Sequence, residues 1–242
     1  MKNLISTVVR SCLMLALISG WFFDAAAAET VVFVEGGYGN AESAKISDRN
    51  GFDSVDCLIC VSGDLNHIEN GALLGAGFGY RVKSSLRIEV SYTYRGWNDL
   101  AAQDSRDTMY HSSIKSHAAM LSGFFDPPLA LGKAKPYVGA GFGLARNKMG
   151  SIHQDFADGV QDDPGGSVSG IAWQIMLGLN LPVSPQYALN LGYRHFDGGK
   201  LRTDAGTSVV EFRPDAPFEY QSGGVEGKLR TDELILSLRY AF

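Results

Sequence analysis

The chain has 242 residues, a formal net charge of −5 and an apolar content of 45%. Its mild acidity argues against a nucleic-acid partner, because such proteins usually carry a basic patch or stripe. Beyond the N-terminal region no apolar run approaches the roughly 18 residues of a membrane-spanning helix, which excludes helical spans. A membrane β-barrel is not excluded, because its alternating strands hide their hydrophobicity from any average.

The first segment has the pattern of a secretory signal peptide. Lys2 and Arg10 precede an apolar run over 12–23, and small residues follow at 25–28. The run is shorter than the roughly 20 apolar residues of a membrane anchor. We therefore expect residues 1–28 to be removed on export and residues 29–242 to form one barrel domain.

The remaining chain alternates at period two, which is the spacing of β-strands. At its end Leu234, Leu236 and Leu238 share one face, while Glu233 and Arg239 fall on the other. Similar alternation predicts eight strands of roughly ten residues, enough for a tilted strand to cross a bilayer. They are expected near 32–38, 74–82, 86–95, 114–125 (with an uncertain phase), 136–146, 171–181, 187–196 and 233–242.

The connections between these strands alternate between long and short. Long polar stretches lie at 41–70, 97–112, 147–167 and 197–227, and short turns at 83–85, 126–128 and 182–186. Outer-membrane barrels have short periplasmic turns and longer outer loops, whereas a soluble barrel or sandwich, the alternative, has no reason for this alternation. The pattern predicts an all-β fold: an eight-stranded antiparallel transmembrane β-barrel with long extracellular loops.

Aromatic residues gather near the predicted strand ends, where a ring can have one apolar and one wet neighbour. We expect interfacial girdles built from Tyr38, Tyr80, Tyr94, Trp97, Tyr137, Tyr187, Tyr193, Phe196 and Phe242.

Two stretches nearly repeat each other: "GAGFGYRV" begins at Gly75 and "GAGFGLAR" at Gly139. A dinucleotide fingerprint needs G-x-G-x-x-G, but this G-x-G-x-G spacing has the period of a strand. The interior of a barrel of about eight strands is just wide enough for side chains to fill. We therefore expect inward glycines to make room for large inward groups on neighbouring strands.

Seven charged residues fall on the predicted inward faces: Arg81, Arg87, Glu89, Arg95, Arg194, Glu233 and Arg239. Buried charges require partners, so we expect arginine and glutamate to interlock across the lumen. Such a network would leave little water-filled path and argues against a general diffusion pore.

The signal peptide, "PYVGAGFGLA", "LNLGYRHFD" and the ending "LILSLRYAF" carry a family resemblance. The chain resembles the eight-stranded OmpA-like and Opa-like outer-membrane proteins, the broad porin family of Gram-negative bacteria. The resemblance implies a monomeric barrel in the outer membrane, in contact with its lipid and lipopolysaccharide. It also implies that Leu238, Tyr240 and Phe242 belong to the signal read by the barrel-assembly machinery.

Cys57 and Cys60 form C-x-x-C within the first long loop. A redox motif would sit at a helix start, and a zinc site would need two further ligands, of which only His67 is near. A small disulfide-closed loop in an oxidising compartment is the main expectation.

Two further groups could carry chemistry. Asp155, Asp158, Asp162 and Asp163 crowd the third loop without the spacing of an EF-hand, so we expect a solvated acidic loop, with weak divalent-cation bridging to lipopolysaccharide as the alternative. Serines and histidines gather at 111–117, but no G-x-S-x-G elbow accompanies them.

These motifs identify the architecture of the protein but say little about its biochemical activity. We expect no enzyme and no cofactor, and a structural or surface-interaction role of the adhesin or antigen kind. Its possible host or cell-surface ligand would meet the long loops, which a rigid scaffold leaves free to vary. The alternatives are a narrow porin for small solutes and an outer-membrane lipid-modifying hydrolase.

Overall fold

The computed structural model describes residues 30–41, 44–48, 63–65, 71–103, 109–157, 159–212 and 217–242. The predicted signal peptide lies outside these residues, and so do Cys57, Cys60, His67 and Asp158. Every regular element in the described part is a β-strand. No helix in this part of the chain is long and apolar enough to cross a membrane.

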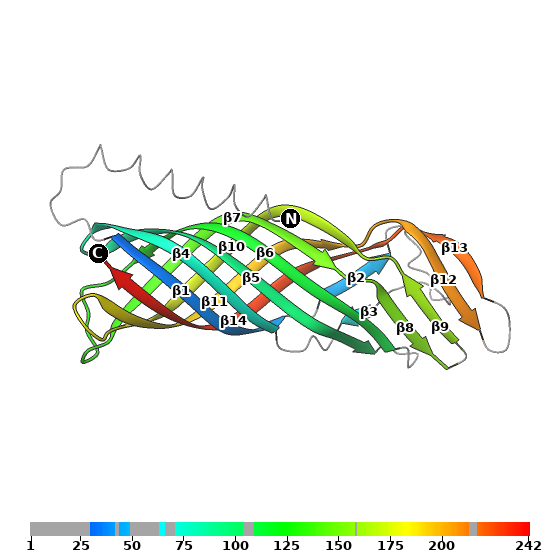
Figure 1. Ribbon diagram of the computed structural model, residues 1–242, viewed down its shortest axis with the longest axis horizontal. Helices are drawn as coiled ribbons and strands as arrows, with labels where there is room; N and C mark the ends of the chain where they lie inside the picture. The colour runs from blue at the N-terminus through cyan, green and yellow to red at the C-terminus, as the bar shows by residue number, and fades with distance from the viewer. Residues whose placement is uncertain are drawn as a thin grey trace.

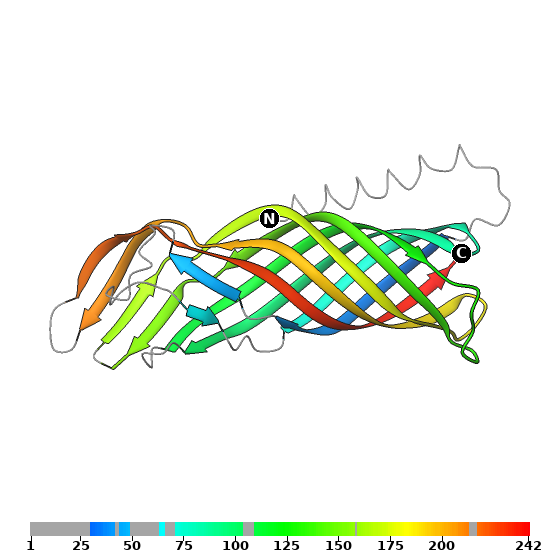
Figure 2. The same ribbon diagram turned by 180° about the vertical axis from the view of Figure 1, so that it is seen from behind.

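Eight long strands form a closed antiparallel barrel (Figure 1). They are β1 (Thr30–Ala41), β4 (Gly71–Lys83), β5 (Leu86–Gln103), β6 (Met109–Phe125), β7 (Lys135–Met149), β10 (Gly166–Pro182), β11 (Tyr187–Arg202) and β14 (Val225–Ala241). The barrel closes where β1 pairs with β14, with Val31 opposite Ala241 and Ala41 opposite Thr231. Figure 2 shows these two strands side by side. The predicted fold class is confirmed.

Six short strands lie in the long connections, at the end of the barrel opposite the short turns. They are β2 (Ala44–Asp48), β3 (Gly63–Leu65), β8 (Ile152–Phe156), β9 (Gly159–Asp163), β12 (Gly206–Phe212) and β13 (Phe218–Ser222). The hairpin β8–β9 follows β7 and precedes β10, the hairpin β12–β13 follows β11 and precedes β14, and β9 pairs with β12. We call these two paired hairpins the extracellular sheet (Figure 1).

The prediction that 97–112, 147–167 and 197–227 are loops is therefore wrong in part. Strands β5 and β6 have 18 and 17 residues, and most of the other two stretches is also strand. On their outward face these extensions carry polar residues such as Lys148 and Lys200, so the outward apolar stripe of the membrane strands does not continue into them. Backbone ladders form between strands whatever the polarity of the side chains.

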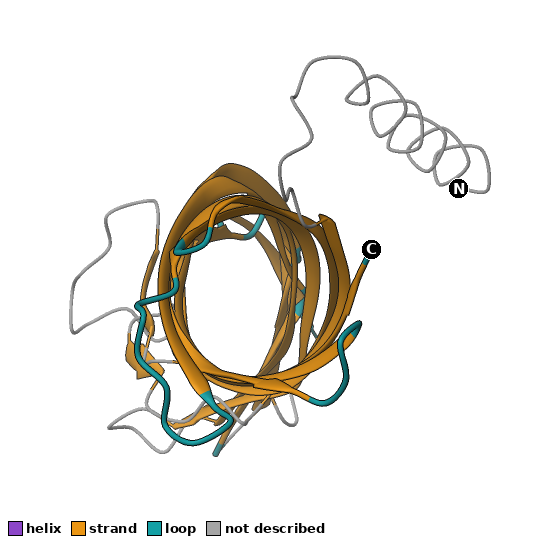
Figure 3. Cartoon of the chain, turned by 90° about the vertical axis from the view of Figure 1, so that its left-hand side faces the viewer, coloured by secondary structure: helices purple, strands orange, loops and turns teal. Residues whose placement is uncertain are grey.

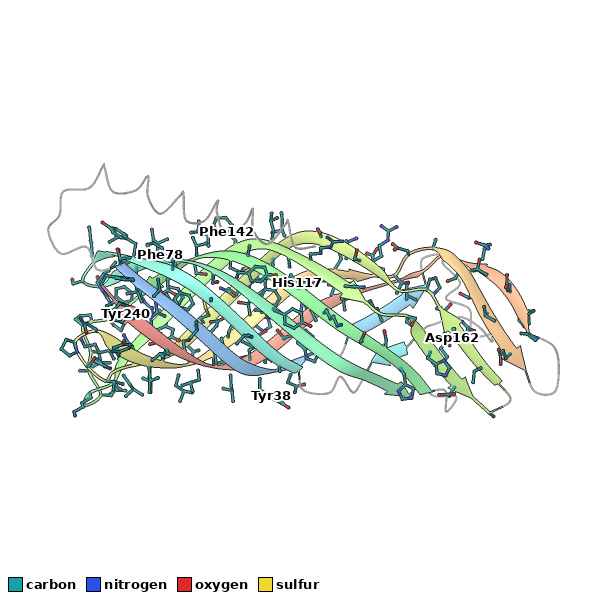
Figure 4. The ribbon with its side chains drawn as sticks, in the orientation of Figure 1. Tyr38, Phe78, His117, Phe142, Asp162 and Tyr240 are labelled. Carbon is teal, nitrogen blue, oxygen red and sulfur yellow. The ribbon has the colours of Figure 1, made fainter. Side chains whose placement is uncertain are left out.

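Burial confirms the predicted alternation across the barrel wall. Leu74, Val90 and Leu236 are exposed on the outside, whereas Glu89 and Glu233 are buried inside. In β6 the even-numbered residues from 114 to 124 are the buried ones, which fixes the phase that the sequence left uncertain. In Figure 4, Tyr240 and Phe78 lie toward the end with short turns, Tyr38 and His117 lie farther along the wall, and Asp162 lies beyond them.

Three residues of the predicted girdles point into the lumen and not toward the membrane. Trp97, Tyr137 and Phe196 are buried, with at most 8% of each exposed. Trp97 and Phe196 share the phase of Arg95 and Arg194, two residues earlier on the same strands, and that phase faces the lumen. Period two decides the direction of a side chain, and closeness to a strand end does not.

The glycines of the repeated stretches lie opposite large inward side chains, as predicted. Gly75 is paired with Glu35, Gly77 with Phe33, and Gly139 with Phe124. A Cβ atom at Gly75 would approach Glu35 Oε1 to 2.8 Å, and one at Gly77 or Gly139 would meet the paired phenylalanine ring. Glycine is used here because the narrow lumen has no space for a second side chain at that level.

We predict that Gly77→Ala lowers the free energy of unfolding by about 1–3 kcal/mol, because overpacking forces neighbours to move. Its Cβ would lie 2.5 Å from the Val90 carbonyl oxygen and against the Phe33 ring. Gly123→Ala is the matched control, since no atom lies within 4 Å of that position. Urea unfolding in phospholipid vesicles checks this, and equal stability of the two variants would contradict it.

Candidate functional site

The outer half of the lumen holds a cluster of two arginines and two glutamates. Glu233 Oε1 accepts a hydrogen bond from Arg95 Nε at 2.6 Å, and Glu233 Oε2 accepts one from Arg194 Nε at 2.5 Å. Arg194 Nη1 also reaches Glu35 Oε1 at 3.0 Å. Thr93 and Thr231 donate to the two glutamates. We call this the Glu233 cluster; its four charges cancel.

A second cluster, the Glu89 cluster, lies nearer the short turns. Arg87 donates to Glu89 at 2.6 Å and to Asp126 at 3.2 Å. Arg239 also donates to Glu89, and Arg81 donates to Asp126 at 2.9 Å. This cluster carries three arginines and two carboxylates, and Arg81 at its edge is the most exposed of the three.

Aromatic and apolar side chains fill the lumen between and beyond these clusters. The Arg87 guanidinium lies 4.2 Å from the centre of the Phe124 ring and 4.8 Å from that of Tyr137. The Arg95 guanidinium lies 3.7 Å from the centre of the Phe196 ring. Toward the outer mouth follows an apolar cluster formed by Ala41, Trp97, Ile114, Met149, Ile152, Leu201, Val225 and Leu229.

Two cavities lie along the lumen axis. A cavity of about 810 Å³ opens at the short-turn end and reaches Glu89 and Arg239. A cavity of about 30 Å³ follows from those two residues toward Glu35 and Arg194. Figure 3 shows the ring of backbone end on, and both cavities lie inside this ring among inward side chains such as Glu89 and Arg239.

The structure brings all seven of the predicted inward charges into these two clusters. Sequence reasoning missed two of their partners, Glu35 and Asp126. Glu35 shares the inward face of β1 with Phe33 and Gly37, so the period of the strand was a signal that could have found it. Asp126 lies in a turn, where no period indicates direction, so only the structure brings it to Arg81 and Arg87.

The acidic third loop divides between a buried and an exposed part. Asp163 is buried and accepts hydrogen bonds from Gln154 at 2.6 Å, Gln161 at 2.8 Å and Ser208 of β12. Asp162 is exposed and lies 2.7 Å from His153 Nδ1. The expectation of a wholly solvated loop is thus wrong for Asp163, because β12 covers it. No group of three potential metal ligands was found among the described residues.

Ser116 and His117 of β6 do not form a nucleophile and base pair. Ser116 points inward and donates to Asn147 Oδ1 at 2.7 Å, whereas His117 points outward and lies 2.6 Å from the Tyr92 hydroxyl. Neighbouring residues of a strand face opposite sides of the sheet. Adjacency in the sequence therefore separates these two groups across the barrel wall.

The predicted assembly residues lie together on the outer wall at the end of β14. Leu238 and Phe242 are exposed, and the Tyr240 ring lies 4.9 Å from the ring of Phe242 and 5.1 Å from that of Tyr187. Recognition of this edge by the assembly machinery stays a prediction.

A closed antiparallel barrel with an apolar outer wall, a polar lumen and short turns at one end defines a class, the bacterial outer-membrane β-barrel proteins. Residues 13–242 match the family described as "Outer membrane protein beta-barrel domain". The chain belongs to this family, and it lies in the outer membrane of a Gram-negative bacterium.

The chain is also similar to individual proteins. It is 23% identical over 181 residues to the outer membrane protein PagN of Salmonella typhimurium, covering 71% of this chain and 72% of that protein. It is similar in structure to OprG of Pseudomonas aeruginosa, with 12% identity, a TM-score of 0.48 and coverage of 88% and 95% of the two chains. For neisserial surface protein A the identity is 19%, the TM-score 0.41 and the coverage 90% and 100%.

We predict that Glu233→Gln lowers the free energy of unfolding by about 3–5 kcal/mol, because it leaves the buried Arg95 without a carboxylate and Arg194 with Glu35 alone. Glu226→Gln is the control, since its partner Lys200 is 62% exposed and surface pairs contribute only about 0–1 kcal/mol. Urea unfolding in vesicles checks the difference. Similar losses in both variants would mean that the Glu233 cluster does not stabilise the barrel.

The hydrogen bond to Asp162 raises the pKa of the His153 imidazole above its ordinary value. A raised folded-state pKa gives stabilisation that is complete below the unfolded pKa and is lost as pH rises through the folded one. We predict that Asp162→Asn lowers the pKa of His153 in an NMR titration, whereas Asp204→Asn leaves it unchanged. An unchanged pKa in Asp162→Asn would show that this pair does not form.

Proposed function

We propose that this protein is a cell-surface barrel whose lumen is closed to solutes and whose extracellular sheet meets a ligand outside the cell, as in an adhesin or surface antigen. The observation that carries the proposal is the packing of the lumen. The side chains of Arg95, Arg194 and Glu233 are each at most 2% exposed, and both arginines donate hydrogen bonds to Glu233. Side chains held in this way serve as a core and favour stability over transport.

The extracellular sheet supports the interaction part of the proposal. Its strands β8, β9, β12 and β13 pair in one ladder, and the buried Asp163 joins the two hairpins through Ser208. Binding residues are often displayed on segments that a rigid scaffold positions. A structured sheet outside the membrane is larger than hairpin closure requires, and it offers a fixed surface to a partner.

A narrow channel is the second candidate, because the cavity of about 810 Å³ opens the lumen from the short-turn end. That cavity reaches the Glu89–Arg239 pair, and a cavity of about 30 Å³ continues from there toward Glu35 and Arg194. Conduction would then require the buried ion pairs to separate, which is costly in a low-dielectric interior. A hydrolase gains no support from Ser116 and His117, which face opposite sides of the wall.

The test replaces Gly206–Ser222, which spans β12 and β13, by an Asn-Gly turn that closes the hairpin of β11 and β14. We predict that this variant still folds, shown by heat-modifiable gel migration, and that its proteoliposomes lose binding to a panel of immobilised host matrix proteins. Neither form should conduct in planar bilayers. The control shortens the turn at 129–133, at the opposite end of the barrel.

The outcomes separate the two candidate functions. Unchanged binding after removal of β12 and β13, or absent binding by the intact protein, would contradict the surface-interaction role. Stable conductance by the intact protein would contradict the closed lumen and support the channel function.

A further inference from the structure

Three cations gather on the outer wall of the barrel, where β6 lies beside β7. Lys115, Arg146 and Lys148 are all exposed, while the residues between them face the lumen. The ladder places Lys115 directly opposite Lys148, and it places Arg146 directly opposite His117. We call these three residues the outer-wall cluster.

Among the described residues, no carboxylate pairs with a charge of the outer-wall cluster. Within the described part of the chain, none of the three residues forms an ion pair or a side-chain hydrogen bond. Like charges directly opposite on neighbouring strands destabilise a sheet. A bound anion would remove the repulsion between Lys115 and Lys148, so this arrangement is suited to a wall that binds an anion.

The wall of β11 and β14 provides an internal comparison. There too cations follow the apolar part of the wall, but carboxylates accompany them. Arg230 pairs with Asp197 at 3.1 Å, and Lys200 pairs with Glu226 at 2.7 Å. Lys228 lies opposite Lys200 and has no such partner in the described part of the chain, so two of the three cations are paired on the β11–β14 wall and none of the three on the β6–β7 wall.

The position of the cluster matches the outer boundary of the membrane. On β7 the outward residues before Arg146 are Phe142 and Leu144, 65% and 67% exposed, and Ile171 beside them on β10 is 76% exposed. Figure 4 shows Phe142 on the outer wall of the barrel and His117 farther toward the end that carries Asp162. The Tyr92 hydroxyl lies 2.6 Å from His117 Nδ1, and tyrosine is enriched where a membrane wall meets water.

Hydroxyl groups complete this surface. Ser169 lies opposite Arg146 and Ser167 lies opposite Lys148, both on the exposed face of β10. Guanidinium, ammonium and hydroxyl groups are the donors that phosphate oxygens accept, and arginine adds a two-pronged geometry. The apolar residues below them would contact hydrocarbon.

We propose that the outer-wall cluster binds the phosphate groups of lipid A, the membrane anchor of lipopolysaccharide in the outer leaflet. The acyl chains would then lie over Phe142, Leu144 and Ile171. The charge, the level in the membrane and the neighbouring apolar surface all fit a phosphorylated lipid. The inference concerns the outer wall alone and does not depend on the closed lumen or on a ligand of the extracellular sheet.

The test compares two triple variants of the full barrel in detergent micelles. The first is Lys115→Gln, Arg146→Gln, Lys148→Gln; the matched control, which removes the same charge from the other wall, is Lys200→Gln, Lys228→Gln, Arg230→Gln. Heat-modifiable migration confirms that both fold. Binding is measured with diphosphorylated lipid A, with the same lipid A after removal of its phosphates, and with inorganic phosphate.

We expect the first variant to bind diphosphorylated lipid A about 10- to 100-fold more weakly than the unchanged protein, and the control to bind it within a few-fold. Dephosphorylated lipid A should bind weakly to all three proteins. Equal binding of diphosphorylated lipid A by the first variant and the unchanged protein, or an equal loss in the control, would overturn the assignment. Tight binding of inorganic phosphate would overturn the lipid as the source of the anion.

Discussion

Hydrogen bonding of the backbone in lipid is the constraint on which this structure depends. The hydrocarbon core offers no partner to an N–H or C=O group, so a sheet within it must close on itself. The first and last strands therefore pair along almost their whole length, with Val31 opposite Ala241 and Gly39 opposite Glu233. Closure with eight strands sets an interior that side chains just fill, and the other features of the lumen follow from that width.

The narrow lumen requires volume and charge to match across strands that are distant in sequence. Glycine lies opposite several of the large groups, as Gly75 does at Glu35. Glu233 holds two arginines from opposite parts of the chain. A slip of one residue in β14 would turn this carboxylate toward lipid, so the Glu233 cluster favours a single register as well as filling space. Stability and strand alignment thus have the same physical origin.

The outer wall obeys different rules from the lumen. Its apolar residues need only be compatible with lipid, so their shapes vary. Polar groups return where the wall leaves the hydrocarbon, as at Lys115 and Arg230. Beyond that level the same backbone ladder continues as the extracellular sheet, where both faces meet water or polar neighbours such as Asp163. The same hydrogen-bonded strands therefore run from the hydrocarbon through the membrane boundary into water, and only the kind of side chain changes along them.

The sequence by itself determined what depends on local period: the number of membrane strands, the side of the wall that most residues of the clearly alternating strands face, and the seven charges that enter the lumen. The phase of β6 and the inward direction of Trp97, Tyr137 and Phe196 came from the structure. The sequence also indicated the alternation of turns and long connections, and hence the membrane orientation. It could not determine which arginine meets which glutamate, because Arg95 and Glu233 come together only when the barrel closes. Nor could it bring Asp126 from its turn to Arg87, or place Lys115 opposite Lys148 without a partner. Those relations are set by register between strands, and register is a property of the closed barrel rather than of any single strand.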